Sequence, residues 1–142
     1  MKQLNPELLL HAMQGELDAI SFYQQLMKMT SDQQDISLIT DIHNDEVKHF
    51  KLFHNLYRQL YGVDAPTIRP REPNIVSFRE GVKQAILDEL ESYELYYEIY
   101  LSSTNPTVRN IFFEAMADEN EHAAKFNFMY TKSLEAMLKP HS

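Results

Sequence analysis

Two short segments of the chain each carry a glutamate and a histidine three residues apart. They are Asp45-Glu46-Val47-Lys48-His49 and Asp118-Glu119-Asn120-Glu121-His122. On an α-helix this spacing points both side chains to the same face, one turn apart. Carboxylate oxygens and imidazole nitrogens are common metal ligands. The two segments therefore predict one shared metal site.

The two segments are part of a longer repeat. Glu119 follows Glu46 by 73 residues, and Glu89 follows Glu16 by the same 73. The offset also pairs the acids, histidines and tyrosines that surround these glutamates, and chance similarity of two amphipathic helices would not produce that agreement. We infer an internal duplication of a helical hairpin. The candidate metal ligands are Glu16, Glu46, His49, Glu89, Glu119 and His122, with Glu91 or Glu94 as alternatives to Glu89.

Helix-start and helix-stop signals locate the elements that must position these residues. Asn5-Pro6 and Asn105-Pro106 are typical of helix starts, Ser77 with Glu80 forms a capping box, and Gly62 is suited to a left-handed helix end. A segment with three prolines separates the second helix from the third. We predict a single all-α domain, residues 1–142, with helices over about 6–29, 34–61, 77–102 and 106–138. Two hairpins, about 5–62 and 77–138, are joined by a long crossover connection over 63–74.

The spacing within each hairpin brings its ligands to one level. Glu16 lies 30 residues before Glu46, with the predicted turn halfway between them, so both glutamates return to the same height along the hairpin. The Glu-x-x-His residues also fall on the apolar stripe of their helices. Four buried carboxylates require compensating positive charge, which two divalent cations supply. Oxygen and nitrogen ligands without thiolate suit iron or manganese, and zinc also binds such a set.

Composition excludes several other classes of protein. The absence of Cys excludes disulfides, thiolate metal sites and cysteine nucleophiles. The net charge of −8, with scattered Lys and Arg, argues against a nucleic-acid binder. No apolar run reaches the roughly 20 residues of a membrane-spanning helix, and the first residues lack a secretory-signal pattern. We therefore expect a cytoplasmic protein that binds neither nucleic acid nor membrane.

With these motifs in place, the chain resembles the ferritin-like diiron-carboxylate proteins, closest to rubrerythrin and bacterioferritin. The resemblance covers nearly all of the chain and implies an antiparallel four-helix bundle with one Glu from each of two helices and a Glu-x-x-His from each of the other two. It implies that Glu16 and Glu89 are terminal ligands, that Glu46 and Glu119 bridge two iron ions, and that each histidine binds one. It also implies that Asp45 accepts a hydrogen bond from His122 and that Asp118 accepts one from His49. Tyr23 and Tyr96 are expected to lie just outside the metal ligands.

The chain departs from the rubrerythrin pattern in two places. Rubrerythrins usually carry a further carboxylate three residues after the third-helix glutamate, where this chain has Ser92. There is also no Cys-bearing rubredoxin domain, so electrons must come from a separate donor or from ferrous iron itself.

The resemblance implies an oxidoreductase, a ferroxidase or peroxidase, that uses two iron ions to reduce dioxygen or hydrogen peroxide in iron handling or protection against oxidative stress. We expect a homo-oligomer, with a dimer favoured. The alternatives are a subunit of an iron-storage cage, a structural or regulatory bundle whose metals do not turn over, and an oxygenase acting on a separate substrate. The sequence shows no substrate pocket by which to judge the last.

Overall fold

The computed structural model describes residues 3–139, and within them it contains four α-helices and no strand. They are α1 (Pro6–Met27), α2 (Gln33–Tyr61), α3 (Phe78–Ser102) and α4 (Pro106–Leu138). The outermost parts of the predicted domain, residues 1–2 and 140–142, lie outside the described residues.

Each helix begins at a capping side chain. Asn5, Ser77 and Asn105 accept backbone N–H groups of the first turns, as predicted. Asp32 does the same for α2 by accepting from the N–H of Asp35, so α2 starts one residue earlier than expected. At the other end of α2, Gly62 has φ 75°, the left-handed conformation that favours glycine.

The first helix ends earlier than its sequence pattern predicts. α1 stops at Met27 and not near Met29, because the N–H groups of Lys28 and Met29 bond to carbonyls three residues back and tighten the last turn. The short connection to α2 follows directly. This difference shifts no candidate ligand, since all of them lie well inside the helices.

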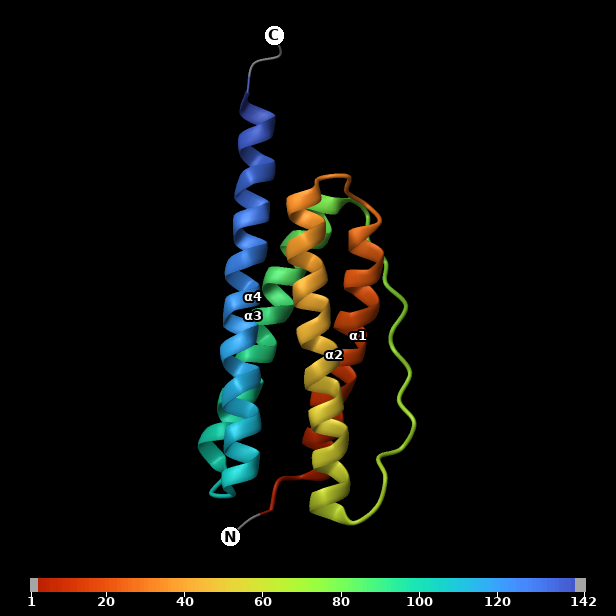
Figure 1. Cartoon of the computed structure of the whole chain (residues 1–142), viewed down its shortest axis with the longest axis vertical. Helices are drawn as coiled ribbons and strands as arrows, with labels where there is room; N and C mark the ends of the chain where they lie inside the picture. The colour runs from red at the N-terminus through yellow and green to blue at the C-terminus, as the bar shows by residue number, and fades with distance from the viewer. Residues whose placement is uncertain (1–2, 140–142) are drawn as a thin grey trace.

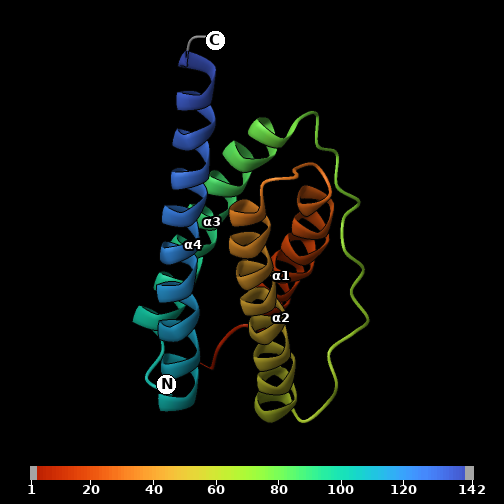
Figure 2. The ribbon, with the colours of Figure 1, turned by 45° about the horizontal axis from the view of Figure 1, so that its top comes forward.

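The helices form an antiparallel bundle of two hairpins, α1–α2 and α3–α4 (Figure 1). The crossover connection runs along the outside of the α1–α2 hairpin from one end of the bundle to the other (Figures 1 and 2). The last turns of α4 project beyond the ends of the other helices. The antiparallel four-helix bundle predicted from the sequence is confirmed.

Buried apolar side chains form two clusters in the interior of the bundle. In one, Phe53 of α2 and Phe112 of α4 stack with ring centroids 4.8 Å apart. In the other, Tyr23 of α1 lies against Phe126 of α4 at 5.1 Å. Aromatic pairs of this kind fix helix spacing through large buried areas. The charged candidate ligands lie on the same inward faces as these two clusters, so packed apolar side chains hold the helices that carry them.

Polar contacts attach the crossover to α1. The amide of Gln14 donates to the carbonyl oxygen of Arg69 at 2.8 Å, and the backbone N–H of Arg71 donates to Asp18 Oδ1 at 2.6 Å. The same Gln14 amide also donates to Asp18 at 2.8 Å. These bonds hold the middle of the crossover against the outer side of α1 and lie next to the cavity described below.

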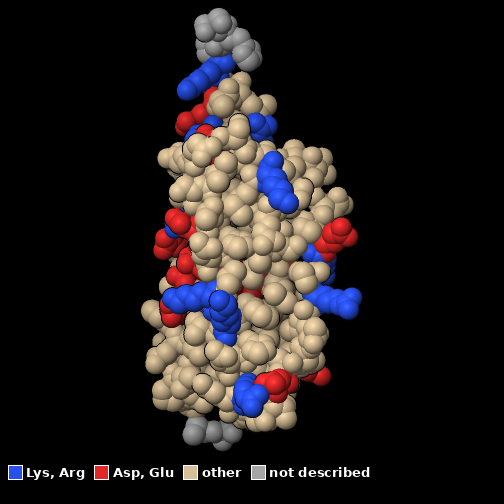
Figure 3. All heavy atoms as spheres, turned by 45° about the vertical axis from the view of Figure 1, so that its right-hand side comes forward, with Lys and Arg blue, Asp and Glu red and all other residues tan. Residues whose placement is uncertain are grey.

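The face of the molecule seen in Figure 3 carries its charges in small groups, several with basic and acidic side chains next to one another. Lys and Arg form no continuous patch on this face. Among the described residues, no helix is both long enough and apolar enough to cross a membrane.

Candidate metal site

The structure brings the six sequence-predicted ligands together in the middle of the bundle. Each is at most 1% exposed. Their ligand atoms form two sets of four residues, and within each set the atoms lie within 4.8 Å of one another. The sets are Glu16, Glu46, His49 and Glu119 for one, and Glu46, Glu89, Glu119 and His122 for the other. Glu46 and Glu119 belong to both sets, so these two carboxylates could serve two metal ions held side by side.

The choice among the third-helix acids follows from burial. Glu89 is 1% exposed and belongs to the ligand set, whereas Glu91 and Glu94 are exposed. Ser92 is half-buried and lines a cavity beside Glu89, so the position where rubrerythrins usually add a carboxylate offers only a hydroxyl.

Each imidazole is held by an aspartate of the opposite hairpin. His49 Nε2 of α2 lies 2.7 Å from Asp118 Oδ2 of α4, and His122 Nε2 of α4 lies 2.8 Å from Asp45 Oδ2 of α2. A carboxylate at one ring nitrogen orients the ring and leaves the other nitrogen for a metal. The free Nδ1 atoms indeed face the site, with Nδ1 of His49 3.2 Å from Glu119 Oε1 and Nδ1 of His122 3.2 Å from Glu46 Oε1.

The buried tyrosines also act across the two hairpins. Tyr23 of α1 donates its hydroxyl to Glu89 Oε1 of α3 at 2.5 Å, and Tyr96 of α3 donates to Glu16 Oε1 of α1 at 2.5 Å. Burial, followed by the charge of the bonded glutamate, raises the pKa of both hydroxyls well above the usual value, so they remain protonated donors. Each outer glutamate is therefore held by a tyrosine from the other half of the repeat.

The electrostatics show how much positive charge the site requires. Burial and the charge of Glu46 raise the pKa of Glu16, Glu89 and Glu119. Burial acts in the same direction on Glu46, but its contacts with His122 and His49 outweigh it, and its pKa is lowered. Without metal ions, the negative charge of the four carboxylates must be compensated by bound protons and by the two imidazoles.

The imidazoles respond to the same environment. Burial alone lowers the pKa of a histidine, but the contacts of His49 with Asp118, Glu16 and Glu46 raise its pKa to about 12. For His122, burial is likewise outweighed by Glu46 and Glu89, and its pKa is raised to about 11. The surrounding carboxylates thus stabilise positive charge on both imidazoles.

The donor atoms fit a pair of divalent cations. Every one of the six residues presents one buried side-chain atom with no hydrogen-bond partner: Glu16 Oε2, Glu46 Oε1, His49 Nδ1, Glu89 Oε2, Glu119 Oε1 and His122 Nδ1. Buried polar atoms are normally paired, so six such atoms converging on one place call for cations. Their oxygen and nitrogen chemistry suits iron, manganese or zinc. Their role as metal ligands remains a prediction.

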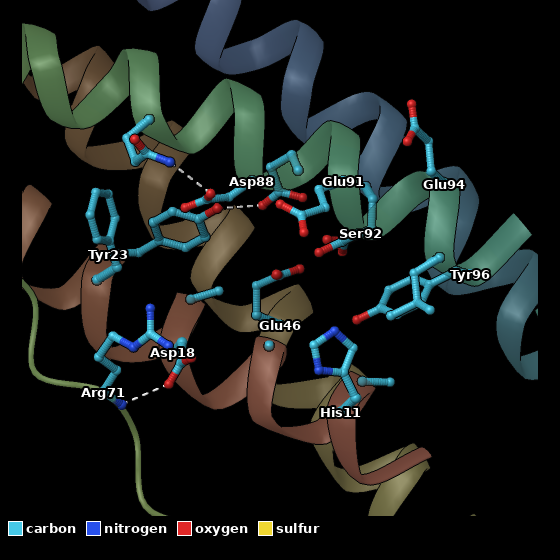
Figure 4. Close-up of a pocket in the computed structure, with 18 of the residues that line it drawn as sticks. His11, Asp18, Tyr23, Glu46, Arg71, Asp88, Glu91, Ser92, Glu94 and Tyr96 are labelled. Carbon is cyan, nitrogen blue, oxygen red and sulfur yellow. Dashed lines mark hydrogen bonds between the residues drawn. The ribbon is translucent and has the colours of Figure 1, made fainter. Parts of the chain in front are cut away.

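A cavity of about 730 Å³ lies between α1 and α3 and reaches the carboxylate side of this site (Figure 4). Its lining includes Glu46, Glu89 and Glu119, together with Arg71 and neighbouring residues of the crossover. The sequence predicted the crossover only as a connection. No sequence signal pointed to the cavity, because it depends on how far apart two helices of different hairpins lie.

A buried carboxylate–histidine site on an antiparallel four-helix bundle defines a ferritin-like protein with a candidate two-metal centre. The family model for rubrerythrin matches residues 7–130, and the chain belongs to the rubrerythrin family. The chain is 28% identical over 117 residues to the uncharacterized protein YhjR of Bacillus subtilis (strain 168), and the match covers 81% of this chain and 79% of that protein.

Solved structures share the fold. A hypothetical protein from Pyrococcus furiosus superposes with a TM-score of 0.81 at 19% identity, covering 92% of this chain and 90% of that one. The conserved hypothetical protein Rv2844 from Mycobacterium tuberculosis has a TM-score of 0.76 at 15% identity over 87% of this chain and 94% of its own. A two-domain protein from Anabaena variabilis with DJ-1/ThiJ/PfpI-like and ferritin-like domains has a TM-score of 0.75 at 15% identity. The match covers 96% of this chain, which spans 39% of that protein.

Proposed function

We propose that the protein is a cytoplasmic oxidoreductase that binds two iron ions and oxidises ferrous iron with dioxygen or hydrogen peroxide. The observation that carries this proposal is the overlap of two four-residue ligand sets at Glu46 and Glu119. Membership of the rubrerythrin family supports it. Two ions held by these overlapping sets would be close enough to act on one small oxidant together.

The chain contributes binding, orientation and charge to this chemistry. When bound, the iron pair supplies two electrons to the oxidant. The four carboxylates offset the charge of two divalent ions, while Asp45 and Asp118 hold the imidazoles. Tyr23 and Tyr96 fix the outer glutamates and remain protonated as donors. The apolar clusters lie inside the bundle on the same inward faces as the site, and each of the six candidate ligands is at most 1% exposed.

To test the proposal, metal-free protein is first loaded with two equivalents of ferrous iron. It is then mixed rapidly with hydrogen peroxide or dioxygen. Ferric absorbance should appear faster than in protein-free buffer. Glu119→Ala removes a shared ligand and should abolish the fast phase. Glu121→Ala, which changes an exposed acid two residues away, should leave it intact. A wild-type rate no faster than buffer, or an unchanged rate in Glu119→Ala, refutes the proposal.

The source of electrons for repeated turnover and the assembly state belong to the same proposal. Because the chain contains no Cys, a thiolate redox centre is excluded, and we assign the re-reduction of iron to a separate donor. We expect a homodimer of the 16.7 kDa chain, which light scattering measures. A mass of many subunits would instead favour an iron-storage cage.

A further inference from the structure

The cavity between α1 and α3 is larger than the proposed oxidants require. Its volume of about 730 Å³ falls within the range of roughly 300–1,000 Å³ that holds small organic ligands. Dioxygen or hydrogen peroxide needs little more than the roughly 30 Å³ of a water molecule. The size of the cavity therefore indicates a larger occupant.

Small residues keep the cavity open along the facing sides of the two helices. Ala12, Gly15 and Ala19 line it from α1, and Ser92 lines it from α3. A Cβ atom built on Gly15 meets no other atom within 4 Å. The space is thus a property of the residue types on both helices and has room for a bound molecule.

The cavity leads to the carboxylate side of the metal site. Glu46, Glu89 and Glu119 line it, each is 1% exposed, and Glu46 Oε1, Glu89 Oε2 and Glu119 Oε1 have no hydrogen-bond partner. On the α2–α4 side, the imidazoles of His49 and His122 are fully buried, with their outer nitrogens taken by aspartates. A molecule in the cavity therefore lies directly against the metal site.

The charge of the lining favours a cation. Three acids outside the ligand sets, Asp18, Asp88 and Glu91, also line the cavity, whereas Arg71 is the sole Lys or Arg of the lining within residues 3–139 (Figure 4). These outer acids remain even when metal ions compensate the buried glutamates.

Part of the lining is apolar and aromatic. Phe22, Tyr23, Leu95 and Tyr96 face the space together with Pro73 of the crossover. Such surfaces bury the carbon skeleton of a ligand, and aromatic faces attract cations. A bare metal ion would use none of these contacts.

We propose that the α1–α3 cavity binds a small organic molecule with a positively charged amino group, held between the outer acids and the aromatic lining beside the metal site. This inference goes beyond the oxidation of iron and does not depend on it, since it concerns binding alone.

Three probes of similar size and different charge test the proposal: benzylamine, benzyl alcohol and benzoate. Each is titrated into ¹⁵N-labelled protein, with and without two equivalents of zinc, and followed by NMR. Benzylamine should bind saturably with a dissociation constant of about 1 mM, a value ordinary for a ligand of this size. It should bind at least about tenfold more tightly than benzoate, because reversing the charge turns attraction into repulsion. Shifts should centre on α1 and α3.

Variants separate the cavity from nonspecific binding. Gly15→Phe fills the cavity and should abolish binding of benzylamine, while Ala124→Phe, at an exposed position of α4, should not. Asp88→Asn should weaken benzylamine binding and leave that of benzyl alcohol unchanged. No saturable binding of benzylamine, equal binding of benzoate, or unchanged binding in Gly15→Phe would each overturn the proposal. The iron-oxidation assay on the same protein shows separately whether the metal site is active.

Discussion

The contact between Asp118 and His49 offers a direct test of how the site is held together. In Asp118→Asn the charged acceptor 2.7 Å from His49 Nε2 is replaced by a neutral amide of the same shape. The ring then loses the partner that orients it and raises its basicity. Loss of such a partner typically lowers metal affinity about 10- to 100-fold, or about 1.4–2.7 kcal/mol. Because Asp118 is the less exposed of the two aspartates, with a side chain 25% exposed, we expect the upper half of that range.

The effect should be confined to one of the two ions. His49 belongs to the set with Glu16, whereas His122 and its own aspartate remain intact in this variant. Titration with zinc against a competing chelator should therefore give two similar affinities in the wild type, and one retained and one weakened affinity in Asp118→Asn. Asp41→Asn, an exposed acid of α2, controls for loss of negative charge. Equal weakening of both affinities, or the same loss in Asp41→Asn, would refute the assignment of Asp118 to His49.

Three further predictions concern stability. Lys132→Met leaves the buried carboxylate of Asp35 without its 2.7 Å partner and should lower the free energy of unfolding by about 1–3 kcal/mol, measured by urea denaturation. Lys125→Met, which breaks a pair with an exposed acid, should change it by less than about 1 kcal/mol, and equal losses would contradict the first expectation. Gly62→Ala forces a side chain into the left-handed region and should cost about 1–2 kcal/mol; a stabilised variant would be inconsistent with the φ of 75°. Metal-free protein should lose stability as the pH rises from about 5 to 8. Folding raises the pKa of both imidazoles, to about 12 and about 11, and that of three glutamates, so the folded state keeps protons that the unfolded chain releases. The difference in Tm between zinc-loaded and metal-free protein should grow as the pH rises over the same range, since metal binding requires deprotonated ligands. A difference that does not change with pH would argue against the metal site.

The fold was largely predictable because its signals are local. Capping residues and proline at helix starts determine helix boundaries through one or two hydrogen bonds, and Asn5, Ser77 and Asn105 act as expected. The end of α1 was less predictable, since the tightened turn after Met27 depends on how the chain enters α2.

The candidate site was predictable for a different reason. The duplication places two copies of a Glu and a Glu-x-x-His at one offset, and helix geometry brings them level. The partners of Tyr23 and Tyr96 could not be deduced in this way. A tyrosine two turns from a glutamate on the same helix finds its hydrogen-bond acceptor on a neighbouring helix. Which acceptor lies there depends on how the hairpins pack. The cavity and the position of Arg71 in its lining likewise depend on packing and could not be deduced from the sequence.

The exchange of contacts between the halves has a consequence for the origin of the chain. Each hairpin provides one aspartate that contacts a histidine of the other hairpin and one tyrosine that donates a hydrogen bond to a glutamate of the other hairpin. A single hairpin therefore contains every type of group that the complete centre uses, but cannot satisfy them within itself. Two identical copies related by a two-fold axis would satisfy them all. The present chain has the form of such a symmetric pair fused end to end, with the crossover as the added link.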